Sequence, residues 1–293
     1  MLQGIPDFRS KGGMYNTLQP DLLTASKHQK SLMRSDSTYV VEKSMFFSNQ
    51  FPYLEVRRPF ILGTAEKRWK ATLSHRFAEL LHTNTGKLTR VYTQNIDGLH
   101  EQCENIPREK IVAVHGTIGR ASCEACGEEM DFKDFCKDVR EKIKDIYNID
   151  NTSPKESSFI HCKKCSKPTV KPTTVLFGGS LPEEFFIRAD QDLPHLDLLI
   201  IAGTSLVVSP ANSLVYNVPS HTIRIIINRD PVGEELGIEY SQPKRDFFAQ
   251  GDCDDIFLEL MCCLGWLDEL IEIADHLPEQ SANLIRSKMN DYL

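Results

Sequence analysis

Short runs of apolar and β-branched residues recur along the chain, and each run ends in small or polar residues. Continuous apolar runs of about five residues are typical of strands in a parallel sheet that is covered on both faces. Helix-like mixtures of polar and apolar residues separate the runs, so the pattern predicts a doubly wound α/β fold. The predicted strands are Thr89–Thr93, Ile111–Val114, Thr173–Phe177, Leu198–Ala202 and Ile223–Ile227.

Two regions depart from this strand pattern. Residues 14–83 lack strand alternation and contain helix-like stretches such as 67–81, which predicts a small helical lobe. After Gly265, apolar residues recur at a helical spacing from Leu267 to Ala274, which favours a helical tail that packs against the core.

Four of the nine cysteines form two Cys-x-x-Cys pairs, Cys123/Cys126 and Cys162/Cys165. One such pair alone could be a redox dithiol, but two pairs predict a closed zinc site with four thiolate ligands, which is typical of structural zinc. The 35 residues between Cys126 and Cys162 are many for a compact zinc ribbon, so we expect a helix within the module 121–167. Its polar, turn-rich stretch 145–158 predicts an exposed loop.

Chemically useful residues follow four of the predicted strands. In open parallel sheets, ligands bind beyond the carboxyl ends of the strands. The sequence therefore predicts a reaction centre at that edge, although a histidine after a strand can also be a core residue and an amide can be a turn cap. The four groups are Gln94–Asp97, His115-Gly116, Gly178-Gly179 and Gly203-Thr204-Ser205.

Composition narrows the functional class. The 293 residues allow about two domains, and the formal net charge of −7 disfavours a nucleic-acid binder, whose footprint is basic. The first residues contain no secretory signal pattern, and no run approaches the ~20 apolar residues of a membrane span. We therefore expect no membrane partner, no direct nucleic-acid contact, and a cytoplasmic or nuclear location.

Seven motifs in this order resemble the sirtuin family of NAD-dependent protein-lysine deacylases, and their spacing is similar to that of class I members. Together they extend from residue 4 to about residue 266. The motifs are Gly4–Ser10, Thr93–Leu99, His115-Gly116, the two Cys-x-x-Cys pairs, Lys171-Pro172 with Val175–Gly178, Gly203–Val208 and Asn228–Asp230.

The resemblance implies that an acyl group passes from lysine to the ADP-ribose part of NAD with release of nicotinamide. It implies His115 as the general base beside the ribose, with Asn95 and Asp97 as further catalytic residues. An imidazole suits proton transfer near neutral pH, which agrees with this assignment. The implied partners are proteins with acylated lysines, histones or others.

The resemblance also assigns binding residues. Ile96, Val175, Phe177 and Gly178 would contact the acyl-lysine substrate, although on pattern alone Val175 and Phe177 are core residues. The implied zinc ligands are Cys123, Cys126, Cys162 and Cys165. The implied NAD contacts are Asp7, Phe8, Arg9, Gln94, Asn95, Ile96, Asp97, Gly203, Thr204, Ser205, Asn228, Arg229, Asp230 and Cys253.

Two positions depart from the family pattern. Sirtuins have a strand and a glycine-rich loop directly before the segment that resembles Gly4–Ser10, whereas only Met1-Leu2-Gln3 precede Gly4 here. The diphosphate cradle is then missing, as in a truncated gene, a splice form or a short protein. The alternative function is therefore a catalytically impaired, sirtuin-like protein-binding module. The second departure is Gly179, where the family commonly has glutamate.

The resulting prediction is a Rossmann-like NAD-binding domain with a smaller helical and zinc-binding domain. A zinc-ribbon scaffold for protein or nucleic-acid contacts is the least favoured alternative, because the module shows no clear basic face. The predicted ranges are 1–13, 84–120 and 168–266 for the NAD-binding domain, 14–83 for the helical lobe, 121–167 for the zinc module and 267–293 for the tail.

Overall fold

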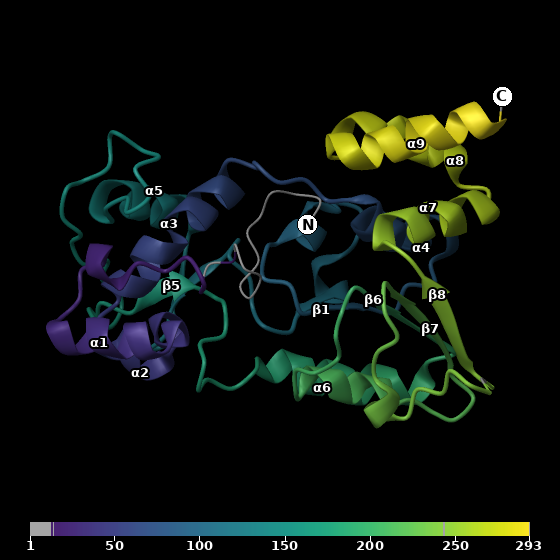
Figure 1. Ribbon diagram of the computed structural model, residues 1–293, viewed down its shortest axis with the longest axis horizontal. Helices are drawn as coiled ribbons and strands as arrows, with labels where there is room; N and C mark the ends of the chain where they lie inside the picture. The colour runs from purple at the N-terminus through teal and green to yellow at the C-terminus, as the bar shows by residue number, and fades with distance from the viewer. Residues whose placement is uncertain (1–12, 14, 243, 293) are drawn as a thin grey trace. The chain divides into compact units, whose positions relative to one another are not determined.

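The structure is a computed structural model that describes residues 13, 15–242 and 244–292 (Figure 1). The internal contacts group the chain into two compact units. We call these unit 1 and unit 2 and describe each by itself. Unit 1 comprises Met1–Trp69, Asn95–Gly98 and His115–Leu181, and unit 2 comprises Lys70–Gln94, Leu99–Val114 and Pro182–Leu293, each as far as described.

Unit 2 contains the parallel strands. Strands β1 (Val91–Thr93) and β2 (Ile111–Ala113) pair in parallel, and β6 (Leu198–Ala202), β7 (Ile223–Asn228) and β8 (Asp246–Gln250) form a parallel sheet in that order. The central strand β7 is the most buried of the three, as expected for an Ile-rich run between two neighbours. The α/β fold with parallel sheets is confirmed.

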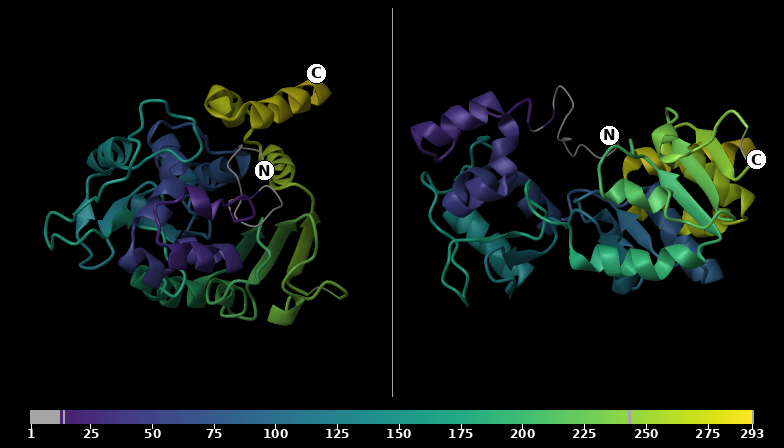
Figure 2. Two further views of the ribbon diagram at one scale, coloured as in Figure 1. Left: turned by 60° about the vertical axis from the view of Figure 1, so that its left-hand side comes forward. Right: turned by 90° about the horizontal axis from the view of Figure 1, so that it is seen from below.

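Helices cover both faces of these strands. Helix α6 (Glu183–Asp192) packs with Tyr92 and Leu199 on one face, and α4 (Leu73–Thr85) and α7 (Cys253–Cys263) pack with Ile225 and Ile227 on the other. The tail forms α8 (Leu267–Ile273) and α9 (Glu279–Tyr292), and Figure 2 shows α9 next to α7. Because Leu270 and Ile285 are buried in the same cluster, the tail packs against the core as predicted.

Short 3-10 helices complete unit 2. They are η3 (Leu99–Gln102), η4 (Arg108–Lys110), η5 (Leu193–His195), η6 (Ala211–Val215), η7 (Glu234–Leu236) and η8 (Ala274–His276).

Unit 1 combines helices with a small antiparallel sheet. Strand β3 lies between β4 and β5 in that sheet, and the helices share an apolar core with it. A capping box between Ser26 and Gln29 begins α1, and the Asp131 carboxylate caps α5. The elements are η1 (Pro20–Leu22), α1 (Lys27–Ser35), η2 (Ser37–Val41), α2 (Lys43–Ser48), α3 (Phe51–Ala65), β3 (Ala121–Cys123), β4 (Glu129–Met130), α5 (Phe132–Lys142) and β5 (Val170–Pro172).

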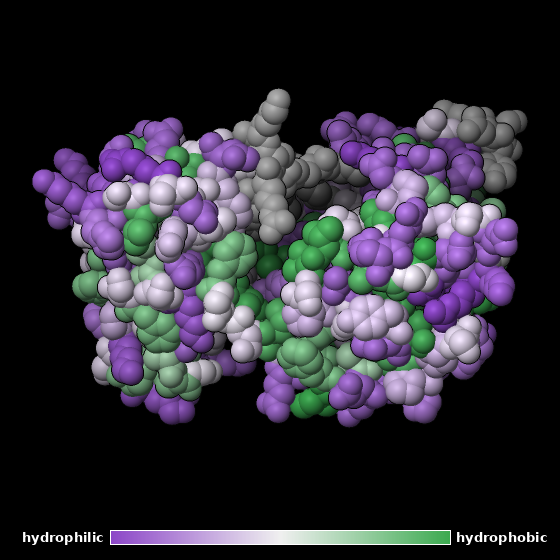
Figure 3. All heavy atoms as spheres, turned by 60° about the horizontal axis from the view of Figure 1, so that its bottom comes forward, coloured by the Kyte–Doolittle hydropathy of each residue, from purple (hydrophilic) through white to green (hydrophobic). Residues whose placement is uncertain are grey.

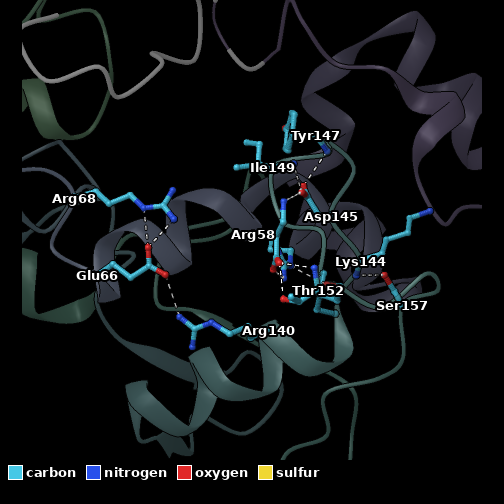
Figure 4. Close-up of polar contacts among 12 residues, drawn as sticks. Arg58, Glu66, Arg68, Arg140, Lys144, Asp145, Tyr147, Ile149, Thr152 and Ser157 are labelled. Atoms are coloured by element: carbon cyan, nitrogen blue, oxygen red, sulfur yellow. Dashed lines mark hydrogen bonds and ion pairs between the residues drawn. The ribbon is translucent and has the colours of Figure 1, made fainter.

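The stretch after α5 is a loop, as predicted, but side chains order it. The Asp145 carboxylate accepts hydrogen bonds from the backbone N–H groups of Tyr147 and Ile149, and the buried Arg58 donates to Asp150 at 2.6 Å (Figure 4). The expected helix within the zinc module is α5. The loop is attached to α3 by the Arg58 guanidinium, by the Tyr147 hydroxyl, which donates to the Val56 carbonyl, and by the Ser157 hydroxyl, which donates to Glu55.

The prediction of a strand at Thr173–Phe177 is wrong. The strand lies earlier, at Val170–Pro172, and it pairs antiparallel with β3 in unit 1 instead of joining a parallel sheet. Beyond it, Phe177 makes only an isolated parallel bridge with Glu42. The physical reason is that backbone hydrogen bonds to His115 and Val41, from different segments, take the N–H groups of Val175 and Phe177.

Two further differences concern unit 2. Strand β8 was not predicted, because its sequence Asp-Phe-Phe-Ala-Gln is not a continuous aliphatic run. Helix α4 lies in unit 2, although the helical lobe was predicted to extend to residue 83, because Leu73, Phe77 and Leu80 pack with the α7 cluster. The other domain boundaries stay predictions.

The described surface is mixed in character. In Figure 3, hydrophilic residues (purple) and hydrophobic residues (green) intermingle over the face that is shown. Among the residues that the structure describes, none of the helices has both the length and the apolar composition needed to cross a bilayer.

Candidate functional site

The cysteines of the two Cys-x-x-Cys pairs come together in unit 1. Their four sulfur atoms lie within 4.8 Å of one another, with 3.6 Å between Cys123 Sγ and Cys165 Sγ and 3.7 Å between Cys126 Sγ and Cys162 Sγ. A tetrahedral zinc ion with Zn–S bonds of about 2.3 Å requires sulfur atoms about 3.8 Å apart. The four thiols therefore fit zinc, and as a complete set of protein ligands they fit a structural ion.

The same backbone turn forms both knuckles. The N–H of Gly127 donates to the Cys123 carbonyl at 2.8 Å, and the N–H of Ser166 donates to the Cys162 carbonyl at 2.9 Å. Both donors have the positive φ that such a turn needs, 74° and 56°. The Thr169 hydroxyl lies 3.1 Å from Cys123 Sγ. Burial opposes ionisation there, but hydrogen bonds from Thr169 and backbone N–H groups outweigh it and lower the pKa of Cys123 to about 6, which favours the thiolate.

Three extended segments of unit 1 lie side by side near His115. The N–H of Ile118 donates to the Ile96 carbonyl at 2.8 Å, and the N–H of Val175 donates to the His115 carbonyl at 2.8 Å. Gly116 has a φ of +73°, and a Cβ there would lie 2.0 Å from the Thr173 carbonyl oxygen. Glycine after His115 is therefore required by close backbone packing, and it keeps the histidine next to Val175.

The stretch from Thr174 to Gly178 alternates between buried and exposed side chains. Leu176 is buried, Val175 is half-buried, and Phe177 is 43% exposed. Phe177 is thus not a core residue. Its own backbone is held, since its N–H donates to the Val41 carbonyl and its carbonyl accepts from the Lys43 N–H. Gly178 is exposed, with a φ of +79°.

In unit 2, polar residues gather where the parallel strands end, around Thr204. Gln94 Nε2 lies 3.3 Å from Thr204 Oγ1, and Asn228 Nδ2 donates to the Thr204 carbonyl at 3.3 Å. The N–H of Gly203 donates to the Ile227 carbonyl at 3.0 Å. The loops after β1, β6 and β7 therefore share one position at the carboxyl edge, where open α/β sheets bind nucleotides.

The loop after β8 completes this edge. A Cβ on Gly203, whose φ is +62°, would lie 3.3 Å from Cys253 Sγ, so the bare glycine leaves space beside the thiol. Burial, together with the nearby Asp254 and Asp252 carboxylates, raises the pKa of Cys253, which keeps it a neutral thiol. Arg229 is exposed and paired with Asp252. This edge therefore combines hydroxyl, amide and thiol groups with a guanidinium that is paired with a carboxylate.

Comparison with known proteins agrees with this geometry. The sequence profile of the Sir2 family matches residues 1–210. The chain belongs to the Sir2 family. Fold, motif order and the four-cysteine cluster now have one explanation, and the predicted resemblance is confirmed.

Named relatives in the Sir2 family cover most of the chain. The NAD-dependent protein deacetylase hst2 of Schizosaccharomyces pombe is 32% identical over 275 residues, which are 93% of this chain and 71% of the relative. The NAD-dependent protein deacetylase sirtuin-3 of Mus musculus is 34% identical over 271 residues, 92% of this chain and 70% of the relative. The NAD-dependent histone deacetylase SIR2 of Candida albicans is 34% identical over 274 residues, 90% of this chain but only 45% of the relative.

The predicted site residues divide between the units, and the chain passes from unit 2 to unit 1 at the Gln94–Asn95 bond. Asp7, Phe8 and Arg9 lie outside the described residues. Unit 1 contains Asn95, Ile96, Asp97, His115, Val175, Phe177, Gly178 and the four cysteines. Unit 2 contains Gln94, Gly203, Thr204, Ser205, Asn228, Arg229, Asp230 and Cys253.

Sequence reasoning missed the polar neighbours of these residues. Thr169 contacts a zinc ligand, and the buried Lys171 forms an ion pair with Glu124 at 3.0 Å. The sequence shows a lysine inside a short strand, which is unusual. It does not show which residue pairs with that lysine.

Proposed function

We propose that this Sir2-family protein is an NAD-dependent protein-lysine deacetylase, which transfers the acyl group from lysine to ADP-ribose and releases nicotinamide. The observation that supports the proposal is the backbone pairing of His115 with Val175 in unit 1: the Val175 N–H donates to the His115 carbonyl, so a residue able to transfer protons is adjacent in the backbone to the segment that contains the exposed Phe177. The names of the relatives favour this enzyme over a silent binding module.

The roles of individual residues follow from this proposal. When bound, NAD supplies the ribose carbon at which the acyl oxygen reacts and the nicotinamide that leaves. Gln94, Thr204 and Asn228 hold its hydroxyl and phosphate groups, with Cys253 on the adenine side. We assign the same cofactor to Gly203, Ser205, Arg229, Asp230, Ile96 and the N-terminal residues Asp7, Phe8 and Arg9.

In unit 1, His115 accepts the proton from a ribose hydroxyl, so that hydroxyl becomes the better nucleophile. Asn95 and Asp97 orient the reacting groups through hydrogen bonds. With four thiolate ligands, a bound zinc ion would have no open position, so it would hold the two knuckles together and take no part in the chemistry.

The proposed substrates are proteins with an acylated lysine, histones or others, in the nucleus or cytosol. Val175, Phe177 and Ile96 supply an apolar path for the acyl chain. An extended substrate segment pairs with the exposed backbone at Gly178, as an added strand. The backbone of Phe177 is already engaged with Val41 and Lys43, which leaves Gly178 as the pairing position.

The test is nicotinamide release from NAD with an acetyl-lysine peptide. Replacing His115 with alanine is expected to lower the rate by about 10²- to 10⁴-fold, as for loss of a general base, with zinc content unchanged. The matched control is His221→Ala, an exposed histidine of unit 2 that has no assigned role. A His115→Ala protein as active as the control would contradict the general-base assignment.

A further inference from the structure

Lys171 is a buried lysine whose ammonium group has an acceptor for each of its N–H donors. Its side chain is 2% exposed, in the middle of strand β5. The ammonium donates to the Pro172 carbonyl at 3.0 Å and the Thr174 carbonyl at 2.6 Å, and it lies 3.0 Å from Glu124 Oε2. An ammonium has three N–H donors, so each donor has one acceptor.

Glu124 connects this lysine to the first zinc knuckle. It lies between the ligands Cys123 and Cys126, and its backbone N–H donates to the Thr169 carbonyl at 2.8 Å. Its second carboxylate oxygen, Oε1, lies 3.4 Å from Lys43 Nζ. One carboxylate of the knuckle therefore faces two lysines from distant parts of the sequence.

These two lysines hold opposite ends of the same segment. Lys171 fixes the carbonyls of Pro172 and Thr174, and the backbone N–H of Lys43 donates to the Phe177 carbonyl at 2.9 Å. Between them, the Thr174 hydroxyl lies 2.6 Å from the Tyr53 hydroxyl. Beyond Pro172, which ends β5, this segment contains Val175 and Phe177 and has no regular strand pairing.

We propose that Glu124, Lys171 and Lys43 couple the zinc knuckle to the acyl-lysine segment, and that Lys171 is a positioning residue for peptide binding. The inference rests on the proposed function and extends it. A buried ion pair is costly to desolvate, and an apolar residue would fill a strand position as well. What an apolar residue cannot do is bind two carbonyls and a knuckle carboxylate at once.

The coupling has a reciprocal consequence. If an intact knuckle favours the peptide-binding form of residues 172–177, then bound peptide must favour the intact knuckle by the same factor. A saturating acetyl-lysine peptide should therefore reduce the equilibrium loss of zinc to a chelator. If Lys171 had a purely local packing role, this protection would persist in a Lys171 variant at saturating peptide.

The test uses Lys171→Met, which keeps length and removes charge, and Glu124→Gln, which keeps both lysines. The matched control is Lys164→Met in the second knuckle, where the ion pair with Glu128 is exposed. Binding of a labelled acetyl-lysine peptide is measured by anisotropy, the KM for NAD by turnover, and zinc loss with and without peptide.

We expect both test variants to bind peptide about tenfold or more weakly, as for a displaced binding segment. The KM for NAD should stay within about twofold, zinc should remain bound without chelator, and peptide should no longer reduce the equilibrium loss of zinc to the chelator. The double variant should bind no more weakly than the weaker single variant, since both act through one contact. Glu124→Gln keeps the test decisive if Lys171→Met does not fold.

Two results would overturn the inference, and they differ. Normal peptide binding and normal peptide protection of zinc in both variants would remove the coupling and leave the proposed function standing. A wild-type protein that does not prefer the acetylated over the unmodified peptide would remove both.

Discussion

Arg224 in unit 2 and Lys171 in unit 1 are both deeply buried basic side chains, but they connect different parts of the structure. Arg224 in unit 2 is 1% exposed and pairs with Asp246 at 2.5 Å, its registered neighbour on the adjacent strand. Lys171 in unit 1 is 2% exposed and joins a zinc knuckle to a segment with no strand pairing of its own. Arg224 connects its strand partner with the carbonyls of Val215 and Gly237. Lys171 connects the zinc knuckle, which the backbone pairing of β3 with β5 also holds, with the residues beyond the end of β5.

The difference extends to the predicted site residues. In unit 2, loops leave registered parallel strands at one edge, so sheet geometry places Thr204 and Asn228. In unit 1, the segments that carry His115 and Val175 are placed by scattered hydrogen bonds, one glycine and four thiols. Unit 1 should therefore be sensitive to metal and charge, and unit 2 to the packing of its sheet.

The two tryptophans allow each unit to be followed separately. Trp69 packs against Phe60 in unit 1, with ring centroids 6.2 Å apart, and Trp266 packs against Phe77 in unit 2, at 6.0 Å. Replacing either with phenylalanine leaves the other as a reporter of its own unit.

The largest expected effect is the loss of zinc. Cys162→Ser should abolish zinc binding and unfold unit 1, because structural zinc contributes on the order of 10 kcal/mol to folding. Zinc content and the emission of Trp69 report the loss, and Trp266 should be unchanged. The control is Cys263→Ser, an exposed thiol outside the cluster. A folded, zinc-loaded Cys162→Ser protein would refute the zinc assignment.

Next in size is the buried pair of unit 2. Arg224→Met should lower the free energy of unfolding by about 3–5 kcal/mol, because it leaves Asp246 buried without its guanidinium. Replacing both residues, Arg224→Met with Asp246→Leu, should recover part of the loss. Urea unfolding followed by Trp266 measures both.

The Arg224–Asp246 pair also tests whether the buried ion pairs of the two units have different roles. In contrast to Lys171→Met, Arg224→Met should leave peptide affinity and zinc retention unchanged. Weakened peptide binding in Arg224→Met would show that ion pairs in the two units are equivalent, contrary to the argument above.

The smallest effect concerns pH and two neighbouring histidines of unit 2, whose rings are tilted by 55° to each other. His75 and His100 have ring centroids 4.5 Å apart. Burial, with Arg76 nearby, lowers the pKa of His75 to about 4, and burial, with His75 nearby, lowers the pKa of His100 to about 3. The unfolded chain therefore takes up protons below about pH 6.5 that the folded protein does not.

The contribution of these two histidines to the free energy of unfolding should be fully present above pH 6.5. It should fall as the pH decreases toward their pKa values in the folded protein. Each ring should account for about 1–2 kcal/mol between pH 7 and pH 5, since neither ring is completely buried. Urea unfolding of the Trp266 reporter at both pH values measures the loss. His100→Phe, which retains a ring against His75, should reduce the change in the free energy of unfolding between pH 7 and pH 5. If that change stayed the same, it would have to come from other titrating groups.

Much of the fold was readable from local pattern. The aliphatic runs at 198–202 and 223–227 became β6 and β7, and helical spacing in the tail became α8 and α9. Thr173–Phe177 looked equally strand-like but joined no sheet, because its backbone groups bond to His115 and Val41 instead of to a strand partner. Strand β8 was missed because its sequence is not a continuous aliphatic run, and its place in the sheet is set by its pairing with β7.

The sequence by itself determined the family and which four cysteines come together, because spacing and chemistry are local properties of a chain. Only the tertiary structure decided that Gly116 must lack a side chain, that Phe177 is exposed and that Lys171 meets Glu124. Each of these depends on which segments become neighbours. The neighbours of a side chain are set by long-range packing, which short-range pattern does not specify.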